Sequence, residues 1–282
     1  MNRQRRLSIL LHTAAVGVGT AIAAPFVLMI IASVSPQSNL ISRPLKWIPD
    51  TLYLERYQAI FSGGPNSVGA SFRAAFLNTI VVATGTVIIA MVVGVLGAYA
   101  FARLRFRFRR GFLMIFLATY MLPQIALLIP LYLMLNSMNL LDTRLGLILV
   151  DTSLVIPFTL WILSNYFATI PEELEEAALI DGCTRMGALF RVVLPSAKPG
   201  IFAALMFSFL LAWDEFMYAL IFTSSDASKT LTVSISEFAG RYTTDFGLVA
   251  TGGILAALPP VIIAVIFQRY IVSGMAAGAV KG

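Results

Sequence analysis

The sequence predicts an all-α, polytopic membrane protein with six transmembrane helices, and three observations support this fold class. Hydrophobic residues make up 59% of the 282 residues, charged residues only 12%, and the mean hydropathy is +0.86. Such a chain has too little polar surface to cover a water-soluble globule of its size. Its apolar segments are long enough to cross a bilayer as helices, which takes about 20 residues each. These segments cover roughly residues 9–34, 74–102, 111–135, 145–168, 200–222 and 247–272.

The first segment begins like a signal peptide, because three arginines precede an apolar run that contains a small-residue cleavage pattern. Its hydrophobicity continues past that pattern to Ala32, so we expect an uncleaved anchor. No linker separates soluble domains and no repeat has a fixed period. We therefore expect residues 1–282 to form a single transmembrane domain.

Small and helix-breaking residues distinguish the later segments. In the second, Gly94, Gly97 and Ala98 are spaced so that another helix backbone can approach closely. Several other segments contain residues that remove or weaken backbone hydrogen bonds, as expected of helices that line a pathway and move, although single kinks are common in any bundle. These residues are Pro123 and Pro130 in the third, Pro157 in the fourth, and Gly252, Gly253, Pro259 and Pro260 in the sixth.

Lysine and arginine are distributed unevenly between the two sides of the predicted bundle. The termini, the loop of residues 103–110 and the loop of residues 169–199 contain 13 of the 20, whereas the other three connections contain seven. The positive-inside rule therefore predicts that both termini and these two loops are cytoplasmic. We interpret the net charge of +6 as a signal of topology and of contact with anionic lipid, and not of nucleic-acid binding.

Several kinds of chemistry lack their usual residues. The one cysteine, Cys183, excludes internal disulfides and cysteine-rich metal sites, and His12 lies in an apolar run where packing is expected. There is no G-x-x-x-x-G-K-[ST] phosphate loop, no G-x-S-x-G and no H-E-x-x-H motif. We expect no catalytic residue, no metal site and no bound cofactor in this chain, so energy for any transport must come from another subunit.

Acidic residues inside the apolar segments are informative, because a charge at mid-depth costs about 3 kcal/mol unless it faces a cavity or a partner. Trp213, Asp214 and Glu215 lie in the fifth segment and are candidates for lining a pathway or contacting substrate. Polar packing between helices is an equally good interpretation. Asp151 lies near the outer end of the fourth segment, where we expect an interfacial position.

The most informative segment is the polar stretch from Pro171 to Pro199, which separates two apolar segments. Pro171 suits the first position of a helix, and the glutamates that follow place negative charge beside its positive N-terminal dipole. Gly182 can end this helix and Thr184 can cap the next one. Leu194 precedes Pro195 and should stop that second helix. Leu174, Ala177, Ala178 and Asp181 share one face, flanked by acids.

A pair of short cytoplasmic helices with small and acidic residues is suited to docking a soluble partner. The alternative is an amphipathic loop that lies on lipid headgroups, but such helices usually present lysine and arginine to anionic lipid. The glutamates at positions 172, 173, 175 and 176 therefore favour a protein partner.

The same residues resemble the EAA motif of permease subunits in bacterial ABC importers. The resemblance covers nearly the whole chain and is to the maltose-permease G-subunit type within the carbohydrate uptake family. It rests on Glu176-Ala177-Ala178, Asp181-Gly182, Leu194-Pro195, residues 78–109, residues 127–149, Trp213 to Phe216, and the terminal Gly278-Ala279-Val280-Lys281-Gly282. It implies the type I importer permease fold in a bacterial inner membrane.

The resemblance also implies roles and partners. Glu172, Glu173, Glu176, Ala177, Ala178, Asp181 and Gly182 would form a coupling helix that binds a cleft of a separate ATPase subunit, on which ATP and Mg²⁺ are bound. The tail of residues 278–282 would reach toward the ATPase dimer. A homologous permease would complete the pathway, and the loop of residues 223–246 would face an extracytoplasmic solute-binding protein that delivers a sugar or polyol.

Two other functions remain as alternatives to this expectation. A secondary, ion-coupled transporter should show inverted repeats and membrane-embedded ion ligands, and the sequence has no visible repeat and few such acids. A membrane enzyme should show nucleophile or metal motifs, which are missing. Turnover by the purified chain would favour the enzyme, and uptake that survives ATP depletion would favour the ion-coupled transporter.

Overall fold

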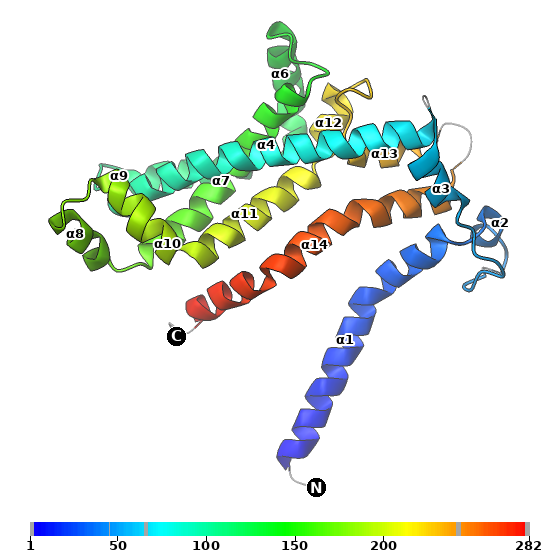
Figure 1. The fold of residues 1–282 in the computed structure, drawn as a ribbon, viewed down its shortest axis with the longest axis horizontal. Helices are drawn as coiled ribbons and strands as arrows, with labels where there is room; N and C mark the ends of the chain where they lie inside the picture. The colour runs from blue at the N-terminus through cyan, green and yellow to red at the C-terminus, as the bar shows by residue number, and fades with distance from the viewer. Residues whose placement is uncertain (1–2, 45, 65–66, 241–243, 280–282) are drawn as a thin grey trace. The chain divides into compact units, whose positions relative to one another are not determined.

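The computed structural model describes residues 3–44, 46–64, 67–240 and 244–279, and every regular element in this part of the chain is helical. The helices of the first half are α1 (Arg3–Ser33), α2 (Gln37–Leu40), α3 (Glu55–Ser62), α4 (Val68–Arg103), α5 (Arg109–Tyr120), α6 (Gln124–Ser137) and α7 (Arg144–Ala168) (Figure 1). Those that follow are α8 (Glu172–Ile180), α9 (Arg185–Ala188), a π-helical turn η1 (Leu189–Val193), α10 (Leu194–Ser196), α11 (Lys198–Trp213), α12 (Met217–Phe222), α13 (Leu231–Glu237) and α14 (Phe246–Ala279).

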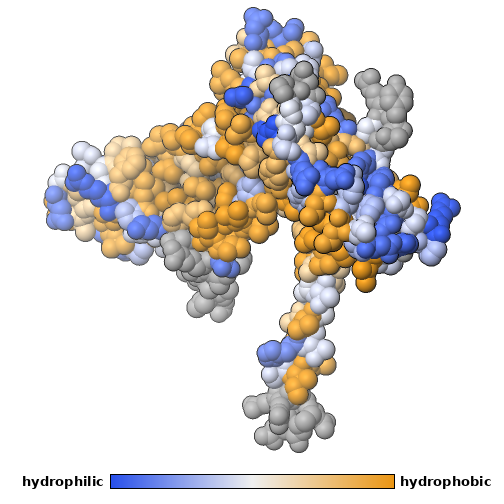
Figure 2. Space-filling model, turned by 45° about the vertical axis from the view of Figure 1, so that its right-hand side comes forward, coloured by the Kyte–Doolittle hydropathy of each residue, from blue (hydrophilic) through white to orange (hydrophobic). Residues whose placement is uncertain are grey.

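Four helical stretches of the described chain are long and apolar enough to cross a membrane: Leu7–Ser33, Val68–Arg103, Arg144–Ala168 and Phe246–Gln268. Two bent pairs, Arg109–Tyr120 with Gln124–Ser137 and Arg185–Ser196 with Lys198–Trp213, raise this to six if each pair is one span. Hydrophobic residues cover much of the surface visible in Figure 2, and hydrophilic residues gather in separate patches on it. The expected all-α membrane fold is therefore confirmed.

Two of the expected spans are not continuous helices. The segment of residues 111–135 is divided into α5 and α6, which meet at 92° around Met121 to Pro123. Pro123 has no N–H to donate and disfavours a helical conformation in the residue before it, so the helix ends there. The segment of residues 200–222 is interrupted between Trp213 and Met217. Pro130 and Pro157, by contrast, lie within α6 and α7.

The described residues form two compact units, and the first comprises residues 1–73 and 234–258. Within this unit the buried side chain of Arg56 on α3 connects separate segments. It donates to the carbonyl of Ser35 over 2.7 Å and lies 3.0 Å from Asp245 in an ion pair. The Tyr57 hydroxyl donates to Ser33 Oγ over 2.9 Å. These contacts hold the chain that follows α1 against the start of α14.

The second unit, residues 74–233 and 259–282, contains two hydrophobic cores at opposite ends of α4 and α7. One core surrounds Tyr99 and Phe167 near the C-terminal ends of these helices, and the other surrounds Val82 and Leu147 near the opposite ends. The two helices approach closely, because a Cβ atom on Gly97 would lie 2.5 Å from Leu160 Cδ2. A Cβ on Gly94 would likewise meet Thr159, so the predicted close approach at these small residues is confirmed.

Candidate functional site

The polar segment after α7 folds into two short helices joined by a tight turn, as its sequence predicts. Helix α8 begins at Glu172 after Pro171, and its first turn contains three glutamates. It ends in a Schellman motif, in which the N–H of Gly182 donates to the carbonyl of Leu179 over 3.1 Å and the N–H of Cys183 donates to that of Ala178 over 2.9 Å. Gly182 has φ +85°, a conformation that glycine adopts without steric cost.

The second helix begins where expected but continues further. The Thr184 side chain accepts a hydrogen bond of 3.1 Å from the Gly187 N–H, so Thr184 caps α9 as predicted. The predicted stop at Leu194 is wrong, because this residue has helical φ −62° and ψ −46°. The preceding turn is a π-helix in which the Leu194 N–H reaches back to the Leu189 carbonyl. This wider turn gives room for Pro195, whose ring would clash with a carbonyl in a regular α-helix.

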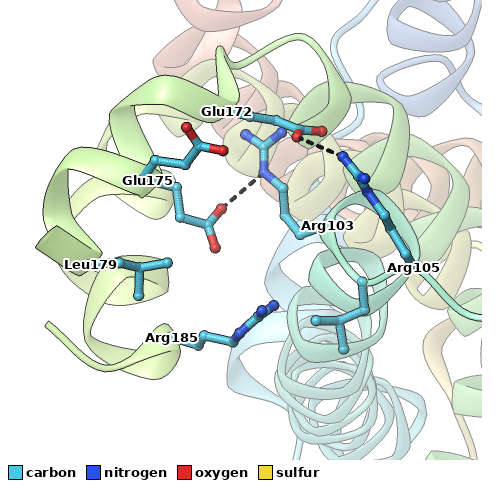
Figure 3. A pocket seen from close by; sticks show the side chains of 8 residues that line it. Arg103, Arg105, Glu172, Glu175, Leu179 and Arg185 are labelled. Atoms are coloured by element: carbon cyan, nitrogen blue, oxygen red, sulfur yellow. Dashed lines mark ion pairs between the residues drawn. The ribbon is translucent and has the colours of Figure 1, made fainter.

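A buried ion pair attaches α8 to the C-terminal end of α4 (Figure 3). Arg103 Nε lies 3.1 Å from Glu175 Oε2, and the two side chains are only 5% and 8% exposed. The two atoms lack the alignment of a hydrogen bond, so the attraction between charges holds them. Arg103 Nη2 also donates to the carbonyl of Ile170 over 2.8 Å, and the Tyr99 hydroxyl donates to Glu175.

These contacts connect three parts of the second unit. Arg103 and Tyr99 lie on α4, Ile170 lies just after α7, and Glu175 lies on α8. The Tyr99 hydroxyl also contacts the Arg185 carbonyl at 3.3 Å, which brings in α9. The paired helices are therefore fixed to the ends of two long helices through side chains, in addition to the chain itself.

Most of the predicted coupling residues lie on a solvent-exposed surface, which we call the outward face of α8. Glu172, Glu173, Glu176, Ala177, Asp181 and Gly182 are all exposed. Two apolar side chains accompany them, Leu174 at 47% and Ile180 at 86% exposure. Ala178 differs, because it is only 8% exposed. The face that we predicted from helical spacing was therefore partly wrong: Ala178 lies on the inner side with Glu175.

A cavity of about 480 Å³ is bordered by the end of α4, by the loop that follows it, and by α8 and α9. Arg103, Arg105 and Arg185 line it together with Glu172, Glu175 and Glu176, and Figure 3 shows the labelled arginines and glutamates around it. Arg105 and Glu172 are 3.9 Å apart at its rim, with side chains 90% and 59% exposed. Water and salt screen this outer pair, whereas the Arg103–Glu175 pair is shielded from both.

The candidates in the fifth segment have separate surroundings. Trp213 is 3% exposed and packs against Phe209 and Phe76, with ring centroids 5.2 and 6.0 Å away. Glu215 accepts hydrogen bonds from the N–H groups of Tyr218 and Ala219 over 2.8 and 2.9 Å. It therefore caps α12 after the interruption. Among these three candidates, Asp214 alone has an exposed side chain.

Asp151 is buried within the second unit, whereas its place in the sequence had led us to expect an interfacial position. It is 2% exposed and lines the same cavity as Asp214 and Glu215. The predicted tail of residues 278–282 is described only in part. Gly278 and Ala279 end α14, whereas Val280, Lys281 and Gly282 lie outside the described residues.

Sequence reasoning missed the roles of Arg103, Tyr99 and Glu175. Glu175 was counted only as one of several acids, and Arg103 only as part of a basic loop. The available signal was the three-residue spacing of Glu175 and Ala178, which places both on one helical face. Arg103, the partner of Glu175 on α4, is 72 residues away in the sequence, so no local pattern predicts the pair.

In the loop between α6 and α7, Asp142 holds the connection between α12 and α13. Its Oδ1 accepts from the N–H groups of Ser224 and Ser225 over 2.9 and 3.0 Å and from the Ser228 hydroxyl. Partial burial opposes ionisation of Asp142, but these hydrogen bonds outweigh burial and lower its pKa below the usual value.

Comparison with known proteins agrees with this architecture. The family model described as "Binding-protein-dependent transport system inner membrane component" matches residues 90–277. The chain is 36% identical over 258 residues to the sulfoquinovosyl glycerol transport system permease protein SmoH of Agrobacterium fabrum, covering 92% of this chain and 88% of that one. It is 37% identical over 239 residues to the trehalose transport system permease protein SugB of Mycobacterium tuberculosis, covering 84% and 85%.

A third relative is the trehalose/maltose transport system permease protein MalG of Thermococcus litoralis. It is 33% identical over 259 residues, and the alignment covers 92% of this chain and 91% of that one. Among solved structures, a bacterial ABC transporter involved in the import of alginate matches with a TM-score of 0.77 at 21% identity, over 96% of this chain and 99% of that chain. That likeness concerns the fold. The family match and the identities together show that the chain belongs to the inner-membrane components of binding-protein-dependent transport systems.

Proposed function

We propose that this chain is one permease subunit of an ATP-driven importer for a carbohydrate or a related polyol. It forms the translocation pathway with a homologous permease, and a separate ATPase dimer binds ATP and Mg²⁺ and supplies the energy. An extracytoplasmic solute-binding protein delivers the cargo. The names of the relatives support a carbohydrate, because SugB and MalG are permeases for trehalose or maltose and SmoH is one for sulfoquinovosyl glycerol.

The observation that supports this function most strongly is the attachment of an exposed acidic helix to two long helices. A partner that moves the outward face of α8 also moves Glu175, and through Arg103 it moves the end of α4. The hydrogen bond from Arg103 to the Ile170 carbonyl extends the same connection to the end of α7. A buried, charged contact is rigid enough to transmit such a displacement, whereas a flexible loop would absorb it.

The outward face also has the composition of a protein contact. Its acids complement a basic cleft, Ala177 permits close approach, and Leu174 and Ile180 supply apolar surface. Coupling then takes a simple form: closure of the ATPase dimer on ATP displaces α8, and the long helices exchange between inward-facing and outward-facing arrangements. In this proposal the termini and α8 are cytoplasmic, the tail of residues 278–282 contacts the ATPase, and the loop of residues 223–246 faces the binding protein.

The energy source is tested by uptake of labelled sugar into proteoliposomes that contain the complete complex. We expect uptake to require ATP on the ATPase side and binding protein on the other side, and to persist when a protonophore removes the proton gradient. Uptake that continues without ATP and stops with the protonophore would instead establish the ion-coupled alternative.

The docking role is tested by reversing one charge on the outward face. Glu176→Lys should weaken assembly with the ATPase or lower sugar uptake per ATP hydrolysed, because a like charge then faces the basic cleft. Insertion into the membrane should not change. The matched control is Asp50→Lys, which reverses the charge of another exposed acid, 68% exposed, in the predicted outer loop. Equal uptake by Glu176→Lys and the control would contradict the docking role.

A further inference from the structure

A second cavity, of about 440 Å³, lies within the second unit where two interrupted helices meet α7. Its volume is within the range of small-molecule sites in proteins. Tyr120 and Gln124 reach it from the two sides of the α5–α6 break, Asp214 and Glu215 from the α11–α12 break, and Asp151 and Phe158 from α7. The Tyr218 hydroxyl, on α12, contacts the Gln124 carbonyl at 3.4 Å, so the two breaks are adjacent.

Interrupted helices at membrane depth are often found around binding cavities. A break exposes backbone groups that lipid cannot hydrogen-bond, and it is tolerated where it is covered by protein or lines a cavity. In many transporters such breaks line the place where cargo binds. Here both breaks border one cavity, which is difficult to explain as two unrelated packing defects.

Asp151 supplies an independent observation. It is the eighth residue of α7, about 10 Å along the helix axis from its start at a rise of 1.5 Å per residue. Its residue is 98% buried, and its Oδ1 atom has no hydrogen-bond partner. A buried acceptor without a partner is costly, so a water molecule, a proton or a ligand is expected to satisfy it in the native protein.

The other residues define what kind of ligand fits. Phe158 stacks with Tyr120 at a centroid distance of 6.0 Å and meets Phe207 edge-on at 5.9 Å, so one wall is aromatic. The Asp151 and Asp214 carboxyls are acceptors, and Glu215 adds negative potential although its oxygens already cap α12. Within the described residues the acids do not form a group able to hold a metal ion. Aromatic faces with adjacent acceptors suit a sugar ring, whose C–H face stacks while its hydroxyls donate.

We propose that this cavity is a cargo site within this subunit, specific for a polyhydroxylated cargo without negative charge. This inference rests on the proposed function and extends it to a substrate class. Hydroxyl groups donate to Asp151 and Asp214, and the same carboxyls repel uronates and sulfonated sugars. An intramembrane site in this subunit would add to the selectivity of the binding protein by rejecting anionic cargo inside the pathway.

Cysteine labelling tests the site in the assembled complex. Cys183, the only cysteine of this chain, is first replaced by serine, and Leu211 in the cavity wall is then changed to cysteine. At each position the labelling rate of a trimethylammonium-ethyl methanethiosulfonate reagent is divided by that of its sulfonate analogue. This ratio should be on the order of tenfold larger at Leu211→Cys than at the control Leu52→Cys in the predicted outer loop. Asp214→Asn, added to Leu211→Cys, should reduce this preference for the cationic reagent.

Protection by sugars is the second measurement. Trehalose, maltose or diacetylchitobiose should slow labelling at Leu211→Cys, and a mannuronate disaccharide should not. Asp151→Asn should weaken protection about tenfold in sugar concentration, as expected when a hydrogen bond to a charged acceptor becomes one to a neutral amide oxygen. Asp214→Asn, at an exposed side chain, keeps the test valid if Asp151→Asn fails to fold, and should let the mannuronate disaccharide protect.

Equal labelling by the two reagents would overturn the proposal, as would protection by none of the neutral sugars or equal protection by mannuronate. If ATP-driven uptake continues in that case, the proposed function stands and only the cargo site is refuted. Failure of ATP-driven uptake itself would refute the proposed function through a different measurement.

Discussion

Replacing Glu175 by glutamine should release α8 from the end of α4. The substitution keeps the shape and an acceptor for the Tyr99 hydroxyl, but it leaves Arg103, with a side chain only 5% exposed, without its counter-charge. Removing one partner of a buried ion pair costs about 3–5 kcal/mol, because the remaining charge is buried and uncompensated. Even the lower value corresponds to a change of more than about a hundredfold in the equilibrium between attached and released α8.

Hydrogen–deuterium exchange of the assembled complex measures this release directly. Amides of residues 172–183 should exchange about a hundredfold faster in Glu175→Gln, since exchange follows the local opening equilibrium. The matched control is Glu172→Gln, which removes an acid of the same helix from a pair that is 3.9 Å apart and mostly exposed. Such a pair contributes about 0–1 kcal/mol, so exchange in the control should change by less than about fivefold.

A double variant separates the charge from the loss of packing. Arg103→Met combined with Glu175→Gln has no uncompensated charge, and replacing a buried ion pair by neutral groups is often nearly neutral. Exchange in the double variant should therefore return toward the wild-type rate, which gives a large coupling energy in the cycle. If Glu175→Gln exchanges no faster than Glu172→Gln, the buried ion pair does not hold α8 and the proposed connection is wrong.

Three further predictions concern other parts of the fold. Gly182→Val should destabilise the turn after α8 by about 1–2 kcal/mol, because φ +85° is strained for a β-branched residue, and it should lower uptake per ATP more than Gly182→Asn does. Asp142→Asn should lower the melting temperature of the complex at pH 7. Because the pKa of Asp142 is lowered in the folded state, its carboxylate stabilises the folded state fully above about pH 4, the pKa of an unfolded aspartate. The difference in melting temperature between the wild type and Asp142→Asn should shrink as the pH falls through the folded pKa of Asp142. Equal melting temperatures at pH 7 would contradict the role of Asp142. Gly97→Val should separate α4 from α7, since even its Cβ would lie 2.5 Å from a Leu160 methyl. Thermal unfolding should show a loss of stability of about 1–3 kcal/mol. Gly64→Val, at an open position, should cause no such loss.

The sequence was sufficient for features that depend on neighbouring residues. Pro171, Gly182 and Thr184 each act on the backbone within a few positions. The structure has the left-handed turn at Gly182 and the cap at Thr184, and the helix starts one residue after Pro171, which is its N-cap and not its first helical residue. The close approach at Gly94 and Gly97 was likewise predictable, because small residues at that spacing remove the side chains that would separate two helices.

Features that depend on distant partners were not predictable in the same way. Which of four neighbouring glutamates is buried depends on Arg103 and Tyr99, and the burial of Asp151 depends on breaks in two other segments. Pro195 indicated a helix end, but a π-helical turn accommodated it. A local rule predicts the preference of a residue, and tertiary contacts decide whether that preference is satisfied in another way.

The claim that the outward face of α8 contacts the ATPase on the cytoplasmic side can be tested by photo-cross-linking. A benzophenone amino acid replaces Ile180, which is 86% exposed, and in a separate variant it replaces Ile48, which is 81% exposed in the predicted outer loop. We predict that irradiation of the assembled complex cross-links position 180 to the ATPase subunit and leaves position 48 unlinked to it. Cross-linking of the ATPase to position 48, or none at position 180 in a complex that transports sugar, would contradict the claim.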